Sequence, residues 1–177
     1  MITIIEGIRN VGKTYLLSRT YTKVYKFDFP YWFKTLDLEE KESTHLFALG
    51  KEILLHNLNK EQFINGLIVD RGILSVLVWG VMKGRINRKT AVKQLKDFAN
   101  KGLLDNVRIV YIDGDNPNKR DCKDAWDCSN PTIERTIYGY LLSQLSELDT
   151  TCEIIRLKNN YDEDTVKEFN KIIEKSI

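Results

Sequence analysis

Residues 2–16 read ITIIEGIRNVGKTYL, and this stretch constrains the architecture of the chain most tightly. It opens with the apolar run Ile2 to Ile5, which is typical of a short buried strand. The pattern G-x-x-x-x-G-K-T follows from Gly7 to Thr14, and a helical stretch begins near Lys13. A strand, a glycine-containing turn and a helix in this order form the context in which the pattern binds a nucleoside triphosphate. The stretch therefore predicts a phosphate-binding loop.

Each residue type in this pattern has a physical reason. Gly7 and Gly12 let the backbone turn so that successive N–H groups point at phosphate oxygens, and the following helix adds its positive N-terminal end. We expect Lys13 to reach the β- and γ-phosphates and the Thr14 hydroxyl to bind Mg²⁺. ATP and Mg²⁺ are the expected cofactors, with GTP left open as the nucleotide. The expected nucleotide contacts are Gly7, Asn10, Val11, Gly12, Lys13, Thr14 and Tyr15.

Apolar runs and helical patterns alternate along the rest of the chain. Further strands are predicted over residues 23–29, 66–70, 107–113 and 152–157, because these are short, apolar or β-branched runs. Helices are predicted over 44–58, 73–84 and 88–102, after Pro131, and from Asp162 onward. Strands that alternate with helices predict a parallel sheet with helices on both faces. The sequence has no repeat or linker, so we expect one α/β domain over residues 1–177.

Composition narrows the class of protein. Hydrophobic residues make up 42% and charged residues 29%, as in a soluble globular protein, and the net charge of +2 is too small to indicate nucleic-acid or membrane binding by itself. No apolar run approaches the roughly 20 residues that span a bilayer, and MITII is too short for a signal peptide. Cys122, Cys128 and Cys152 lack the spacing of metal ligands. We expect free thiols and a cytoplasmic location.

Acidic residues follow the predicted strands at the edge of the sheet where ligands bind in open α/β folds. Asp70 ends the third strand, where it could accept a proton from a phosphate acceptor or hold Mg²⁺ through water, and Arg71 could clamp a phosphate. A strand-end salt bridge is the alternative, and the glycine pattern favours the functional interpretation. Asp28 either orients an acceptor hydroxyl or caps a turn, and both stay open. Asp113 is interpreted as structural.

A polar loop over about 114–130 follows the fourth strand and contains Lys119, Arg120 and Lys123. Its position would let it close over ATP phosphates as a lid, with Arg120 reaching the transferring group. A solvated, charged surface loop is the alternative. Trp126 in the same loop would cover a base or anchor the loop.

An ordered series of stretches resembles the thymidylate kinase family of P-loop kinases. EGIRNVGKTYLL resembles the opening of that family, VYKFDFP its second strand and Phe-Pro turn, and LFALGKEILLHNL its substrate-side helix. VDRGILSVLVWG resembles its Asp-Arg strand end, VKQLKDFANKGLLDNVRIVYID its fourth-strand region, and ERTIYGYLLSQL the helix after its lid. The resemblance covers nearly the whole chain, but only the glycine pattern is highly specific on its own.

The resemblance implies a three-layer P-loop fold with five parallel strands in the order 2-3-1-4-5. It also implies transfer of the ATP γ-phosphoryl group to a nucleotide-like acceptor. Lys13 and Thr14 would bind phosphate and Mg²⁺, and Asp70 and Arg71 would face the acceptor. Phe29 would join the acceptor site, with Phe47 and Lys51 beside the base.

The chain departs from the family where the acceptor would bind. Tyr31 and Trp32 stand where an arginine usually holds the acceptor's phosphate, and Lys51 stands where an arginine usually meets thymine. Tyr31, Trp32 and Phe33 would stack on a base or join the core. We therefore expect a Mg²⁺–ATP kinase of a deoxynucleotide, a deoxynucleoside or a hydroxymethylated base in DNA. A regulatory ATPase without a small acceptor, a module that only binds nucleotide, and a homodimer stay open.

Overall fold

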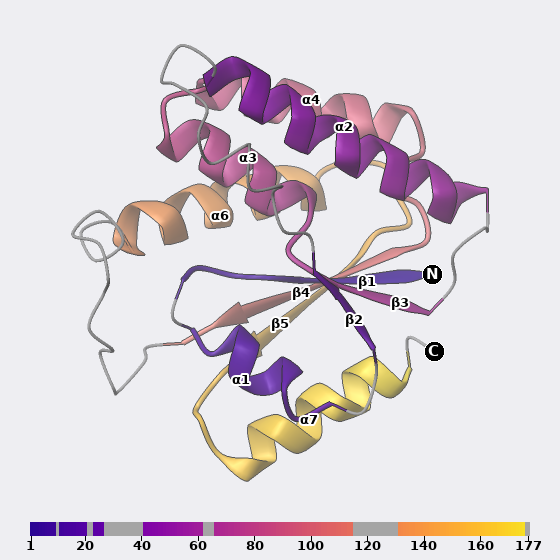
Figure 1. The fold of residues 1–177 in the computed structure, drawn as a ribbon, viewed down its shortest axis with the longest axis vertical. Coiled ribbons are helices and arrows are strands. Elements are labelled where there is room, and N and C mark those ends of the chain that lie inside the picture. Colours follow the sequence, from indigo (N-terminus) through magenta and orange to yellow (C-terminus); the bar gives the residue numbers. More distant parts are fainter. Residues whose placement is uncertain (10, 21–22, 27–40, 62–65, 115–130, 176–177) are drawn as a thin grey trace.

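A computed structural model of the chain describes residues 1–9, 11–20, 23–26, 41–61, 66–114 and 131–175. The strands are β1 (Ile2–Glu6), β2 (Val24–Lys26), β3 (Leu67–Asp70), β4 (Val107–Asp113) and β5 (Glu153–Lys158). The helices are α1 (Lys13–Leu17), α2 (Lys41–Lys60), α3 (Ile73–Met82), α4 (Arg88–Asn100), α6 (Pro131–Ser146) and α7 (Glu163–Glu174) (Figure 1).

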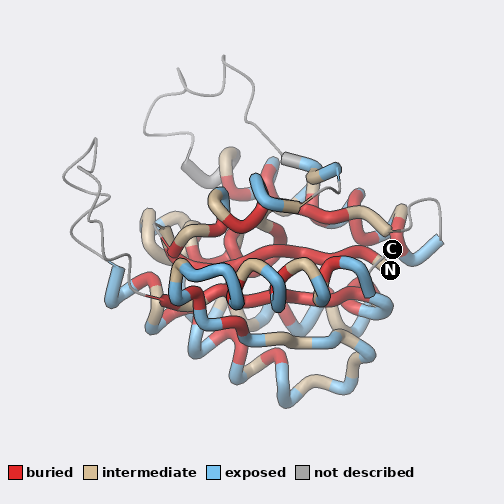
Figure 2. Tube along the Cα trace, turned by 90° about the horizontal axis from the view of Figure 1, so that it is seen from below, coloured by how far each residue is buried: buried red, intermediate tan, exposed pale blue. Residues whose placement is uncertain are grey.

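The strands form one parallel sheet in the order β2-β3-β1-β4-β5, which confirms the predicted α/β class and strand order. β1 lies in the middle, where Ile5 pairs with Asp70 on one side and with Val110 on the other. Every residue of β1 is buried, as expected of a central strand with helices on both faces. Figure 2 shows this buried layer running through the middle of the molecule.

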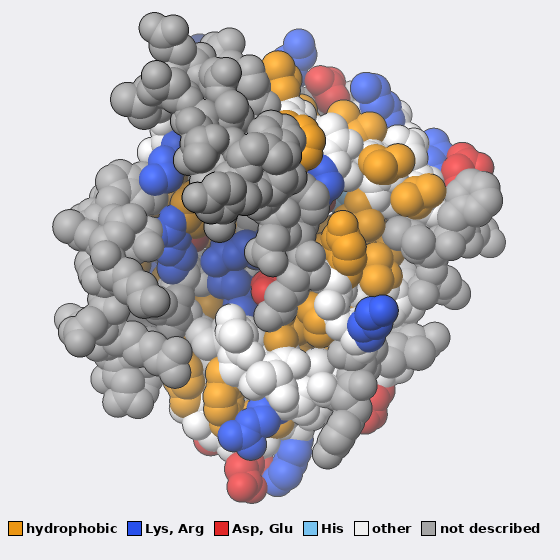
Figure 3. Space-filling model, in the orientation of Figure 1, with side chains coloured by type: hydrophobic (Ala, Val, Ile, Leu, Met, Phe, Trp, Pro, Cys, Tyr) orange, Lys and Arg blue, Asp and Glu red, His pale blue; other side chains and the backbone are white. Residues whose placement is uncertain are grey.

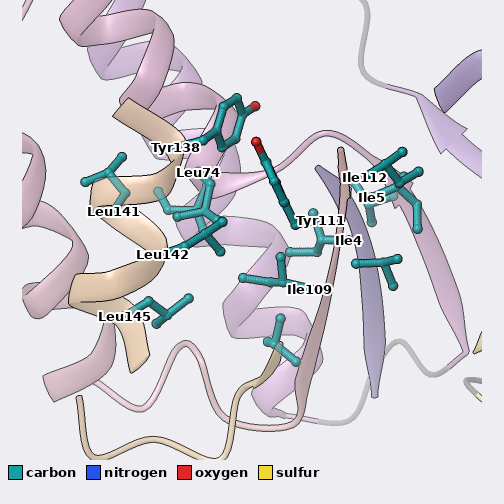
Figure 4. Close-up of a cluster of buried hydrophobic side chains, with 14 of the residues drawn as sticks. Ile4, Ile5, Leu74, Ile109, Tyr111, Ile112, Tyr138, Leu141, Leu142 and Leu145 are labelled. Carbon is teal, nitrogen blue, oxygen red and sulfur yellow. The ribbon is translucent and has the colours of Figure 1, made fainter. Parts of the chain in front are cut away.

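The helices form the two outer layers. In Figure 1, α2, α3, α4 and α6 cover one face of the sheet, and α1 and α7 cover the other. Apolar side chains fill the space between these layers. Figure 4 shows Leu74, Leu141, Leu142 and Leu145 from α3 and α6 against the strands. All four are buried, so these two helices supply much of the core on their side of the sheet.

Glycine shortens two of the predicted helices. The helices predicted over 73–84 and 88–102 end at Met82 and Asn100. Gly84 and Gly102 follow with φ values of 66° and 65°, the left-handed conformation that commonly terminates a helix. The last strand is shifted by one residue, to Glu153–Lys158.

α2 differs from the predicted pattern in which side chains it buries. Its spacing of apolar residues predicts an apolar buried face, yet Leu46 and Leu54 are 63% and 62% exposed. Phe47 and Ile53 are exposed as well, and hydrophobic side chains gather on this part of the surface in Figure 3. The buried face includes the polar residues His45, Glu52, His56 and Asn59. Of the helices that the structure describes, none is long and apolar enough to span a bilayer.

Candidate functional site

The glycine loop is the name used here for residues 7–14, which comprise the turn after β1 and the first two residues of α1. It begins at the carboxyl end of the central strand. Gly7 has a φ of 140°, and a Cβ there would lie 2.3 Å from the Ile112 carbonyl oxygen. Gly12 has a φ of 82°, and a Cβ there would lie 2.3 Å from Asn159 Nδ2. Only glycine fits either position, because any side chain would meet both steric contact and backbone strain.

Asn159, directly after β5, holds the glycine loop in place. Its buried side chain donates a hydrogen bond from Nδ2 to the Val11 carbonyl oxygen at 2.8 Å and accepts one at Oδ1 from Tyr161 N at 2.9 Å. Its backbone N–H donates to the Asp113 carbonyl oxygen at 2.7 Å. The loop is therefore attached to the ends of β4 and β5. Nothing in the local sequence distinguishes Asn159 from an exposed loop asparagine, so its role was not predicted.

Lys13 is buried at the start of α1. Its Nζ donates hydrogen bonds to the carbonyl oxygens of Gly7, at 2.7 Å, and Ile8, at 2.5 Å, so the side chain folds back across the glycine loop. Burial, and after it the charge of Arg71, lowers the pKa of Lys13 to about 7. α1 has only five residues, so its first-turn N–H groups, rather than a long helix dipole, would face an anion.

Three carboxylates oppose this lowering of the Lys13 pKa: Glu6, Asp70 and Glu134. They come from β1, β3 and α6, which are far apart in the sequence. The predicted partners Lys13, Asp70 and Arg71 are thus brought into electrostatic range of one another at one edge of the sheet. Glu6 and Glu134 were not among the predicted site residues.

Glu6 is the centre of a buried hydrogen-bond network. Its Oε1 accepts from Gly72 N at 3.0 Å and Ser75 N at 3.1 Å, and its Oε2 accepts from Tyr138 OH at 3.1 Å and from Ser75 Oγ. Burial raises the pKa of Glu6, whereas these hydrogen bonds and the charge of Arg71 oppose the rise. Figure 4 shows Tyr138 beside Tyr111, whose ring centroid lies 5.4 Å from that of Tyr138. The network joins β1, α3 and α6 directly behind the glycine loop.

Asp70 and Arg71 lie where β3 ends. Arg71 has a φ of 71°, which costs a non-glycine residue about 1–2 kcal/mol. Its backbone N–H donates to the Ile5 carbonyl oxygen at 3.0 Å. The hydrogen bonds that Gly72 N and Ser75 N donate to Glu6 also help to hold this conformation. Asp70 Oδ1 and Arg71 Nη1 are buried and have no hydrogen-bond partner among the described residues. Buried polar atoms in this state favour a ligand that would satisfy them.

α6 contacts the site through its first turn. Glu134 Oε2 accepts a hydrogen bond from the Arg9 backbone N–H at 3.3 Å, and the next residue, Arg135, forms an ion pair with Asp113 at 3.1 Å. Arg135 also donates to the Gly114 carbonyl oxygen at 3.1 Å. Asp113 therefore links β4 to α6, in agreement with its interpretation as a structural residue.

The other predicted site residues are distributed around this centre. Thr14 is exposed on α1, and the Tyr15 ring lies 6.3 Å from that of Tyr161. Phe47 is exposed on α2, and Lys51 forms an ion pair with Glu52. The Glu52 carboxylate lies beside the β3 end, since its Oε2 would be 3.4 Å from a Cβ at position 72.

Several predictions fall outside the described residues and stay predictions. They concern Asn10, Asp28, Phe29, Tyr31, Trp32, Phe33, Lys119, Arg120, Lys123, Trp126, Cys122 and Cys128.

Cys152 lies in the described part of the chain and is a free cysteine, and burial raises its pKa to about 12. Within the described ranges, no three His, Cys, Asp or Glu side chains form a group that could hold a metal ion by themselves.

The chemistry that the site can perform follows from its donors. An anion with several oxygens suits this site. Lys13 and Arg71 supply positive charge, and the backbone at Gly7 and Gly12 can approach the anion because neither residue has a side chain. Asp70 Oδ1 and the Thr14 hydroxyl are oxygen ligands of the kind that Mg²⁺ prefers alongside phosphate.

Comparison with models of protein families and with curated proteins returns no match to this chain. The function is therefore argued from the site geometry and the sequence pattern.

Proposed function

We propose that the protein is a Mg²⁺–ATP-dependent phosphotransferase of the P-loop kinase class, similar to thymidylate kinases. One observation carries the proposal. A buried lysine whose Nζ reaches back over the glycine loop lies in electrostatic range of an Asp-Arg pair at the end of the adjacent strand. Phosphoryl transfer needs positioning and charge neutralisation more than covalent help, and this set of side chains supplies both.

The residues of the glycine loop would bind the triphosphate. Backbone N–H groups around Gly12 would face the phosphate oxygens, and Lys13 would exchange its bonds to Gly7 and Ile8 for the β- and γ-phosphates. Thr14 and Asp70 would hold Mg²⁺, directly or through water; when bound, the ion neutralises phosphate charge. The close contact at Gly12 with Asn159 supports this role, because it keeps the loop backbone in one conformation before ligand arrives.

Asp70 and Arg71 would act on the acceptor. Asp70 Oδ1 is unpartnered within the described residues, so it can accept a hydrogen bond from an acceptor hydroxyl and take up its proton. Arg71 can donate to the transferring phosphoryl group through the planar edge of its guanidinium. The strained backbone at Arg71 supports a functional interpretation, since such strain is concentrated at sites of binding and catalysis. The proposed acceptors are a deoxynucleotide, a deoxynucleoside or a hydroxymethylated base in DNA.

An acceptor screen with radiolabelled ATP tests the function. The protein is incubated with Mg²⁺, labelled ATP and, separately, deoxynucleoside monophosphates, deoxynucleosides, unmodified DNA and hydroxymethylated DNA. We expect label to transfer to one class, and Lys13→Ala to abolish the transfer. Lys167→Ala, an exposed α7 residue outside the site, is the matched control and should leave transfer unchanged. Release of labelled phosphate without transfer to any acceptor would indicate an ATPase instead.

A further inference from the structure

Positive charge is concentrated in and just before α4. Residues 85–96 contain five lysines and arginines and no acidic residue, whereas the whole chain has a net charge of only +2. The remaining residues therefore carry a net charge of −3 together. A basic stripe along one helix is the electrostatic pattern expected of a surface that binds a polyanion.

The packing of α4 turns its lysines away from the core. The buried residues of this helix are Ala91, Leu95 and Phe98. Lys89, Lys93 and Lys96 follow one another at intervals of four and three residues, which places them on one face of the helix, and all three are exposed. The Asn87 side chain accepts a hydrogen bond from Thr90 N at 2.8 Å and caps the start of the helix. A regular, capped helix thus presents the three lysines to solvent.

The cations of this segment are not paired with carboxylates within the described part of the chain. The α4 basic stripe, as it is called here, comprises Arg85, Arg88, Lys89, Lys93 and Lys96. Among the described residues, no ion pair or side-chain hydrogen bond involves any of these five side chains, and Asp97, which follows them, forms no ion pair either. Arg85 Nε is also buried and has no hydrogen-bond partner there. A buried N–H group in this state favours a ligand that accepts from it.

The stripe suits a polymer of phosphates better than a membrane. Lys89 and Lys96 lie about 10 Å apart along the helix, and the same length of duplex DNA carries about six phosphates. A helix that lies in a membrane interface needs exposed apolar side chains as well as cations. None of the exposed large hydrophobic side chains that the structure describes lies on α4.

We propose that the α4 basic stripe binds the phosphate backbone of duplex DNA. Contacts of this kind do not depend on the base sequence, and they weaken steeply as salt is added. The binding stands on its own, and its link to the acceptor rests on the proposed function. The ten residues of α3, about 15 Å, separate the Asp70–Arg71 turn from the turn that leads into the stripe. DNA held on α4 can therefore present a base to the proposed acceptor site, which selects DNA from among the proposed acceptors.

DNA binding in the absence of ATP tests the stripe. The protein is titrated into a short fluorescent duplex at several salt concentrations, and anisotropy reports the affinity. A triple variant carries Lys89→Gln, Lys93→Gln and Lys96→Gln. We expect its affinity to fall about tenfold or more near 0.1 M salt. The slope of log affinity against log salt should decrease by about 3, because each lost phosphate contact contributes roughly 0.9.

Lysines on α7 provide a matched control, because this helix covers the other face of the sheet (Figure 1). Lys167, Lys171 and Lys175 are exposed, and α7 also contains four acidic residues. Replacing these three lysines by glutamine changes the net charge by the same amount and should leave DNA affinity nearly unchanged. Arg85→Gln, measured as a single variant, should weaken DNA binding severalfold and serves if the α4 triple variant does not fold.

A membrane is tested in parallel, because α2 exposes Leu46 and Leu54 in the same layer of helices. Vesicles that contain phosphatidylserine are titrated under the same conditions. Binding of the wild type to these vesicles but not to the duplex overturns the choice of DNA. Wild-type affinity for DNA in the α4 triple variant and in Arg85→Gln, or an equal loss in the α4 and α7 triple variants, overturns the stripe as the binding surface.

Failure of the proposed function has a separate signature. If the stripe binds DNA but no label passes from ATP to any acceptor, the DNA-binding surface is supported and the phosphotransferase is not. If label passes to a deoxynucleoside and the wild type binds no DNA, the phosphotransferase is supported and the stripe is not.

Discussion

At the level of single residues, Lys13 has the most consequential environment. Burial in the glycine loop brings its pKa to about 7, so a large fraction of the free protein carries a neutral lysine at neutral pH. Under the proposed function, triphosphate binding would favour the ammonium form, because negative phosphates would replace two carbonyl oxygens as its partners. Protonation of this one side chain would then be linked to nucleotide binding.

Nucleotide binding should take up a proton on the alkaline side of the Lys13 pKa. At about pH 8, where free Lys13 is mostly neutral and bound Lys13 is charged, we expect uptake approaching one proton per ATP analogue bound. Above pH 7 the affinity should fall as pH rises, for the same reason. Calorimetry in buffers of different ionisation enthalpy measures the uptake. Lys13→Arg stays charged throughout and should take up no proton, and equal uptake by both proteins would contradict the assignment.

Asp70 offers a second test at the residue scale. Asp70→Asn keeps the size of the side chain but removes its charge and its capacity to accept a proton. We expect kcat to fall about a hundredfold or more, with little change in affinity for the ATP analogue. Arg71→Lys should mainly raise KM for the acceptor, since it loses the planar fork. Near-normal kcat together with a lower melting temperature in Asp70→Asn would identify the residue as structural.

At the level of elements, the glycine loop depends on the turn between β5 and α7. Asn159 donates to the Val11 carbonyl oxygen, packs against Gly12 and bonds to the end of β4. The conformation that would bind phosphate is thus held by a residue that belongs to a distant strand end. This arrangement predicts that a substitution away from the nucleotide alters nucleotide affinity.

Asn159→Ala tests this connection. The substitution leaves the Val11 carbonyl oxygen without its side-chain donor and opens space beside Gly12, so we expect a loss of about 1–3 kcal/mol in the free energy of unfolding. Affinity for the ATP analogue should fall severalfold or more as the loop loses its fixed conformation. Asn160→Ala, at the exposed neighbouring position, is the control for both measurements. Lower stability with unchanged affinity would show that Asn159 does not position the loop.

At the level of the whole molecule, a buried polar network joins the sheet to one helical layer. Glu6 in β1 bonds to Ser75 in α3 and to Tyr138 in α6, and Tyr138 OH lies 2.7 Å from Ser75 Oγ. Desolvation by burial is the main reason that the pKa of Tyr138 lies well above its usual value, and the nearby Glu6 charge adds to it. A network in which each polar group has a partner favours one packing arrangement over others.

Tyr138→Phe should reveal how much this network contributes to stability. The change removes one hydroxyl that donates to Glu6 and contacts Ser75, so the free energy of unfolding should fall by about 1–3 kcal/mol. Urea denaturation followed by circular dichroism measures it. Tyr140→Phe, on the same helix and 44% exposed, provides the matched control and should change stability little. Equal free energies of unfolding for both variants would show that the Tyr138 hydroxyl adds nothing to stability.

The architecture was predictable because its signals are local. Short apolar runs, helical periodicity and the glycine pattern each depend on residues close in sequence, and they were enough to predict a parallel sheet covered by helices. The strand order came from the resemblance to the thymidylate kinase family. Gly7 and Gly12 stand where backbone sterics require glycine, so their importance is visible in the sequence itself. Asp70 and Arg71 were predicted to lie near the glycine loop by the same logic, since strand ends at one sheet edge lie together.

The surroundings of the site were decided by tertiary structure. Glu6 and Tyr138 are 132 residues apart, Asn159 and Val11 are 148 apart, and Arg9 meets Trp79 from a different element. α2 illustrates the same limit, because its buried face contains polar His45 and Glu52 while Leu46 and Leu54 are exposed. Periodicity indicates where a helix runs but not which polar groups find partners inside. Those partners come from distant segments, and their hydrogen bonds and ring contacts leave no local pattern in the sequence.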